Sequence, residues 1–154
     1  MNQYQLRGNR VEPMMLNEIA SRAIHIGKYF GFTRKNKKNL DSAFEALSEL
    51  GITLNVVPDN EWLNLTKGHY DPNTLTVSVP ERIYLNACMG EKEALGVMLH
   101  ELGHLFLGHR ALLHHSSRPP VMEEDAEWQA DSFAEVILEN MGYQTEQLSF
   151  DFYM

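Results

Sequence analysis

The sequence predicts a small α+β domain in which a short antiparallel sheet packs beside several helices. Apolar residues recur at helical spacing in several segments, β-branched residues gather at 52–57, and Asp71-Pro72-Asn73 is typical of a turn between two strands. With 154 residues and 44% hydrophobic content, the chain is long enough to bury one core. We expect a single domain over residues 1–146, followed by a short tail over 147–154.

The first helix is expected to begin at Pro13, because proline fits the first turn of a helix, and to end near Phe30 before Gly31. Part of its buried face should consist of the apolar residues Ile19, Ala20, Ala23, Ile24 and Tyr29.

The remaining elements are expected in a simple order. A second helix covers about 41–50, and a strand follows at 52–57. Two further strands lie on either side of the turn at 71–73. An apolar helix around 94–107 and a second one over 126–141 complete the domain, each ended by a glycine.

Composition excludes several classes of protein. The formal net charge of −8 argues against general binding to nucleic-acid backbones. The single cysteine, Cys88, excludes a disulfide framework and a cysteine-based zinc site, and we expect it to be a buried structural thiol. The polar N-terminus, 1–10, lacks the apolar run of a signal peptide, and no span approaches membrane length. A cytoplasmic protein with no membrane contact is expected.

Residues His100, Glu101 and His104 form an H-E-x-x-H pattern within a strongly apolar stretch. On a helix, two histidines four apart lie on one face, ~6 Å apart along the axis, so both can reach one metal ion. Glu101 can then face a water in the open position of the metal. The alternative is a pair of core histidines with a solvated Glu101. Burying that carboxylate in so apolar a helix would cost several kcal/mol unless it were paired or linked to a metal, which favours the metal site.

A third ligand is needed, and His109 is the nearest candidate along the chain, with His114 and His115 beyond it. The pattern H-E-x-x-H-x-x-G-x-x-H fails here, because leucine and arginine occupy its last two fixed positions. Gly108 is instead expected to end the helix in a left-handed conformation, which leaves His109 near the helix terminus without a metal role.

The second candidate is Glu127, on the helix expected over 126–141. Glu127 and Asp131 are four residues apart and share a face that borders the apolar stripe. In a zinc site, Glu127 binds the metal, and Asp131 accepts the other N–H of a ligating imidazole and fixes its tautomer. The alternative is an ordinary solvated face, and Glu124 remains a fallback ligand.

The paired motifs resemble the ImmA/IrrE family of metallopeptidases. Residues 100–104 (HELGH) and 127–134 (EWQADSFA) are similar to that family's H-E-[LIF]-[GA]-H and E-x-x-A-[ND]-x-F-A patterns, and the hairpin at 68–79 is similar to the strand pair that precedes its motif helix. The resemblance covers roughly 52–140. It departs at 135–140, where family members often carry Leu-Leu-Met-Pro. It implies a zincin-like fold and a gluzincin-like peptidase that uses Zn2+.

The resemblance also implies a biological role. Members of this family often act as site-specific regulatory proteases on helix-turn-helix repressors, in mobile elements or stress responses, so a separate repressor is an expected partner.

The strand at 74–79, or its hairpin partner at 68–70, could offer an open edge to an extended peptide. Gly68 suits a close approach of backbone there, although a β-bulge explains it equally well. The oxyanion donor is expected among His69, Tyr70, His109, His114 and His115. The alternative function is a non-catalytic or weakly active zincin-fold binding module.

The C-terminal tail carries a second hypothesis. Residues 147–152 (QLSFDF) alternate apolar and polar side chains, which is typical of an edge strand that docks on its own domain. The same residues are also similar to the hexapeptide that binds the bacterial sliding clamp. That alternative makes the clamp a partner, with the anchors Gln147, Leu148, Phe150 and Phe152.

Overall fold

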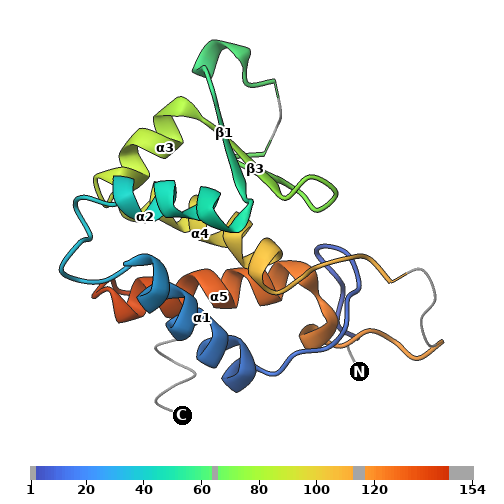
Figure 1. Cartoon of the computed structure of the whole chain (residues 1–154). Helices are drawn as coiled ribbons and strands as arrows, with labels where there is room; N and C mark the ends of the chain where they lie inside the picture. The colour runs from blue at the N-terminus through green and yellow to red at the C-terminus, as the bar shows by residue number, and fades with distance from the viewer. Residues whose placement is uncertain (1–2, 64–65, 113–116, 146–154) are drawn as a thin grey trace.

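The computed structural model describes residues 3–63, 66–112 and 117–145, and these form an α+β arrangement (Figure 1). The fold class predicted from the sequence is therefore confirmed. The α-helices of the described residues are α1 (Leu16–Phe30), α2 (Asp41–Glu45), α3 (Glu81–Cys88), α4 (Lys92–Phe106) and α5 (Ala126–Asn140). The strands are β1 (Thr53–Val57), β2 (His69–Asp71) and β3 (Thr76–Pro80), and short 3-10 helices lie at Ala46–Leu50, Asp59–Glu61 and Met122–Glu124.

The sheet is mixed, so the expected antiparallel sheet is wrong for one strand pair. The strand order is β1-β3-β2. β2 pairs antiparallel with β3 across the predicted turn, whereas β1 pairs parallel with β3. The chain reverses between β1 and β2 and again at the hairpin, so β3 runs in the same direction as β1. β3 takes the central position because its Val77 and Val79 are fully buried.

Helix α1 begins later than the sequence predicts. Before it, Val11 and Met14 donate backbone hydrogen bonds to the carbonyls of Glu124 and Glu123. Pro13 therefore lies in a segment that pairs with the 3-10 turn before α5, and the helix starts only at Leu16. Its end at Gly31, with φ of 89°, is as expected.

The buried face of α1 was predicted only in part. Ile19, Ala20 and Ala23 are buried, whereas Ile24 and Tyr29 are exposed, with 42% and 66% of their surface accessible. The true stripe continues through Gly27 and Phe30. A residue directly after a stripe position, such as Ile24 after Ala23, is turned about 100° away from the core.

Two further segments depart from expectation. The predicted helix over 41–50 is a short α2 that continues as a 3-10 helix up to Gly51. Helix α3 was not predicted, since its eight residues are too few to display a helical repeat. Cys88 at its end is buried as expected, and burial raises the pKa of its thiol.

Helices α4 and α5 pack against each other and carry the candidate site between them (Figure 1). Glu91 caps α4 by accepting from the backbone N–H of Ala94 at 2.7 Å, and Asp125 caps α5 by accepting from the N–H of Glu127 at 2.9 Å. As predicted, Gly108 and Gly142 take left-handed conformations after the two helices, with φ of 68° and 98°.

Two expectations concern membrane spans and the C-terminal tail. No helix among the described residues is both long enough and apolar enough to cross a membrane. The tail at 147–154, with its sliding-clamp hypothesis, lies outside the described residues, as do His114 and His115.

Candidate metal centre

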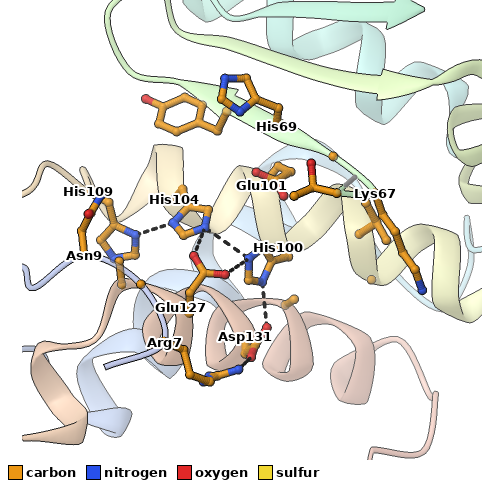
Figure 2. A pocket seen from close by; sticks show the side chains of 18 of the residues that line it. Arg7, Asn9, Lys67, His69, His100, Glu101, His104, His109, Glu127 and Asp131 are labelled. Carbon is orange, nitrogen blue, oxygen red and sulfur yellow. Dashed lines mark hydrogen bonds and ion pairs between the residues drawn. The ribbon is translucent and has the colours of Figure 1, made fainter. Parts of the chain in front are cut away.

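A cleft of about 920 Å³ runs over the junction of α4 and α5. Its floor includes His100, Glu101 and His104 from α4 and Glu127 from α5. The start of β2 forms one side, and the N-terminal segment at residues 7–9 forms another (Figure 2). The H-E-x-x-H motif therefore opens onto this cleft.

His100, His104 and Glu127 converge on one point, and each offers one ligand atom within 4.8 Å of the others. His100 Nε2 lies 3.1 Å from Glu127 Oε1, and His104 Nε2 lies 2.9 Å from Glu127 Oε2. The two Nε2 atoms are 3.2 Å apart. Ligands at about 2.0–2.1 Å from a tetrahedral zinc ion are separated by roughly 3.3 Å, so the donor set is compatible with a metal ion of that size.

The charges at this point favour a cation. Although burial lowers the pKa of His100, hydrogen bonds to Asp131 and Glu127 raise it to about 10. Hydrogen bonds from His100 and His104 in turn hold the pKa of Glu127 well below its usual range. Asp131 and Glu127 thus favour a positive charge beside them, and a divalent cation could take the place of the His100 Nε2 proton.

Asp131 lies behind His100, on the side away from the convergence point. Its Oδ1 is 2.7 Å from His100 Nδ1, and its Oδ2 accepts from the Arg7 guanidinium at 2.9 Å. Burial raises the pKa of Asp131, but the hydrogen bond from His100 and the contact with Arg7 lower it more, so it stays ionised. An ionised Asp131 accepts a hydrogen bond from Nδ1–H, so that Nε2 is the nitrogen of His100 that could bind a metal after losing its proton.

Glu101 stands beside the three ligand residues without joining them. Its side chain is buried, and that burial raises its pKa, so it is a stronger base than an exposed glutamate. It lies against the backbone at Gly68, just before β2: a Cβ placed on Gly68 would be 3.1 Å from Glu101 Cγ. The backbone at Gly68 therefore lies close to the candidate base, while the expected approach of a substrate backbone there stays a prediction.

His109 was set aside by sequence reasoning, and the structure gives it a contact with the site. The chain reverses at Gly108, and the imidazole of His109 folds back so that its Nδ1 is 2.8 Å from Nδ1 of His104 (Figure 2). Its Nε2 lies 2.7 Å from Oε1 of Gln129 on α5. Burial lowers the pKa of His109 to about 4, so this imidazole is neutral.

The N-terminal segment was also missed, because the groups it meets lie more than a hundred residues away. The buried carboxylate of Asp125 accepts from the Tyr4 hydroxyl at 2.6 Å and from the backbone N–H groups of Arg7 and Gly8 at 2.9 and 3.2 Å. Gly8 is thereby held against Glu127, where a Cβ would lie 2.6 Å from Glu127 Cγ. Only a residue without a side chain fits there.

Glu124, the fallback ligand, is engaged elsewhere. Both of its carboxylate oxygens accept from the Arg10 guanidinium, at 3.0 and 3.1 Å. It does not belong to the metal-compatible cluster of the described residues.

A family model, the IrrE N-terminal-like domain of peptidase M78, matches residues 47–144, which is more than half of the chain. The chain belongs to this family. The resemblance to the ImmA/IrrE metallopeptidases is thus confirmed, and the matched region contains both motifs. No curated protein and no solved structure shows a significant match. The segment around Gly8 and helix α1 precede the part of this M78 chain that the family model covers.

Proposed function

We propose that this M78-family protein is a zinc-dependent, gluzincin-like endopeptidase, in which His100, His104 and Glu127 hold the metal and Glu101 is the catalytic base. The observation that carries the proposal is the triangle of ligand atoms with a buried carboxylate beside it. A purely structural zinc site needs no base next to the metal, so an intact Glu101 favours catalysis.

The chemistry follows from the placement of these groups. A zinc ion held by the triangle supplies a Lewis acid for a water molecule and for the carbonyl of the substrate. Glu101 takes a proton from the attacking water as its oxygen bonds to the carbonyl carbon. The same carboxylic acid then gives that proton to the leaving nitrogen as the C–N bond breaks. The raised pKa of Glu101 suits both transfers.

The edge of the sheet suggests how a peptide is held over this site. β3 pairs on one side with β1 and on the other with β2, so the strand at 74–79 offers no open edge over its paired residues. β2 is at the end of the sheet and borders the cleft. An extended substrate would pair along β2 by main-chain hydrogen bonds. His69 and Tyr70, both on β2, remain the oxyanion donors of choice, because His109 is engaged with His104.

The proposed substrate is a helix-turn-helix repressor, cut at a specific site as part of a mobile-element or stress switch. Family membership and the position of β2 at the side of the cleft support this. The alternative function, a non-catalytic or weakly active zincin-fold binding module, predicts the same metal site with little or no turnover.

One substitution separates the two. Glu101→Gln keeps the shape of the side chain but cannot accept a proton. We expect it to bind about one zinc per chain, measured by elemental analysis, and to lose cleavage of a repressor encoded next to it. Glu127→Ala is the matched control and should lose most of its zinc. Cleavage at the wild-type rate by Glu101→Gln would refute the mechanism, and a wild-type enzyme that binds zinc and repressor without cutting would favour the binding module.

A further inference from the structure

A chain of hydrogen bonds leads from His104 away from the metal point into the interior. It passes from His104 Nδ1 to His109 Nδ1 at 2.8 Å and from His109 Nε2 to Gln129 Oε1 at 2.7 Å. Gln129 is 1% exposed and His109 is 9% exposed, so water does not compete for these groups. Each of these two hydrogen bonds contains one proton, which belongs to one of its two atoms.

The backbone at the inner end of the chain settles the direction. Gln129 Nε2 lies 2.9 and 2.7 Å from the carbonyl oxygens of Glu12 and Glu123, which only accept. The amide nitrogen must therefore face these carbonyls, and Oε1 must face His109. Because Oε1 accepts as well, His109 Nε2 carries a proton.

The remaining protons follow in turn. A buried imidazole whose partner is a neutral amide is itself neutral, so His109 has one N–H and its Nδ1 accepts. His104 must then donate from Nδ1. A metal ligand has to be a neutral imidazole, so in the metal-bound protein the lone pair of His104 is on Nε2, the atom that faces Glu127 Oε2 and the convergence point.

We propose that His109 and Gln129 are positioning residues that hold His104 in the Nδ1–H tautomer, with Nε2 aimed at the metal. This inference rests on the metal site proposed above. It gives His104 the support that Asp131 gives His100, but with a neutral partner in place of a charged one. Both supports come from α5, at Gln129 and Asp131, on the helix that also supplies Glu127.

The turn after α4 is built to bring His109 back. Gly108 takes a φ of 68°, and the backbone N–H of His109 donates to the carbonyl of His104 at 3.0 Å. The imidazole of His109 then packs edge-on to that of His104, with ring centroids 5.0 Å apart. The ligand residue and its support are thus tied through both backbone and side chain.

A matched pair of variants tests the role of His109. Asparagine places its Oδ1 near the position of Nδ1 in histidine and can accept a hydrogen bond from His104. Leucine is about as large as asparagine but cannot accept a hydrogen bond. We expect His109→Leu to raise the dissociation constant for zinc about 10- to 100-fold, in competition with a chromophoric chelator, and His109→Asn to stay within about threefold of wild type.

If His109 acted through packing alone, His109→Asn would bind zinc more weakly than His109→Leu, because leucine suits a buried site better than asparagine does. Thermal unfolding in the presence of a chelator measures that packing effect separately. Equal zinc affinity in the two variants, or weaker binding by His109→Asn than by His109→Leu, would overturn the inference. Glu127→Ala separates it from the site itself: if that variant also kept its zinc, the proposed ligand set would be wrong.

A second measurement uses the wild-type protein and does not depend on the folding of a variant. Nitrogen-15 NMR of the zinc-loaded protein reports which imidazole nitrogens carry protons. We expect protons on His104 Nδ1 and on His109 Nε2. A proton on His109 Nδ1 would overturn the proposal.

Discussion

Gly103 of α4 lies directly against the backbone of Ala130 on α5. A Cβ placed on Gly103 would be 3.1 Å from both the Cα and the carbonyl oxygen of Ala130. This contact sets how closely the two helices approach. The approach matters for the site because α4 supplies two of the three candidate ligands and α5 supplies Glu127.

Gly103→Ala should therefore separate the helices and weaken both folding and metal binding. Alanine would favour the helix itself by about 1 kcal/mol, but overpacking against rigid backbone costs about 1–3 kcal/mol. We expect a net loss in the free energy of unfolding and a zinc affinity at least several-fold lower.

Gly96→Ala is the control for this prediction, because it lies in the same helix and its Cβ would meet only the end of Leu138, at 3.7 Å. It should be neutral or stabilising. Urea unfolding and zinc titration check both variants, and equal behaviour of the two would show that the close crossing of the helices is not required.

Local patterns predicted the parts of the site that one helix determines. The spacing of His100 and His104 within α4, and of Glu127 and Asp131 within α5, follows from helical geometry alone. The facing of these two pairs does not, because it depends on the crossing at Gly103. The paired motifs of the resembling family supplied that information.

The contacts that the sequence did not predict depend on reversals of the chain. His109 reaches His104 only because the chain folds back at Gly108, and its partner Gln129 belongs to another helix. Gly8 meets Glu127 through a segment that is far away in sequence. Periodicity carries no information about such pairings, and the same limit explains why the parallel pairing of β1 with β3 was not foreseen.

The N-terminal segment should matter through its shape more than through its charge. Gly8→Ala would place a Cβ 2.6 Å from Glu127 Cγ, so the carboxylate has to move, and we expect zinc affinity to fall about tenfold or more. Arg7→Ala removes an ion pair whose side chains are 55% and 35% exposed, and such pairs contribute under about 1 kcal/mol. Zinc titration should therefore rank Gly8→Ala as the more damaging change, and the reverse order would contradict the steric argument.

Acid should loosen the anchor of the N-terminal segment at Arg10. The two hydrogen bonds from Arg10 hold the pKa of Glu124 below its usual value of 4.5, and both side chains are largely buried, at 7% and 12% exposure. Glu124 is therefore protonated at a higher pH in the unfolded chain than in the folded protein. The stabilisation is complete above about pH 4.5 and is lost as the pH falls through the lower folded pKa.

Glu124→Gln tests this dependence. At pH 7 we expect it to be about 2 kcal/mol less stable than wild type, because a hydrogen-bonded charge is lost. The difference in the free energy of unfolding between wild type and variant should narrow as the pH is lowered below 4.5. Denaturant unfolding at a series of pH values measures it. Glu123→Gln removes the neighbouring carboxylate without touching the Arg10 pair and serves as the control. A gap that stays constant down to pH 3 would show that the pair does not carry the effect.

The contact between Gly68 and Glu101 should separate catalysis from metal binding. A Cβ on Gly68 would lie 3.1 Å from Glu101 Cγ and 3.1 Å from Val97 Cγ1, so Gly68→Ala forces both side chains to shift by a few tenths of an ångström. The three atoms nearest to this Cβ belong to Glu101 and Val97 and not to a candidate ligand, so zinc affinity should stay within about twofold of wild type. The candidate base is displaced, and small misplacements of a catalytic group cost up to about 100-fold in rate. We therefore expect kcat/KM for repressor cleavage to fall by about ten- to 100-fold. Gly8→Ala should instead lower the zinc affinity, so the pair of variants assigns each glycine to a different part of the site. A Gly68→Ala protein that cleaves at the wild-type rate would mean that Glu101 does not act from the position it occupies beside β2.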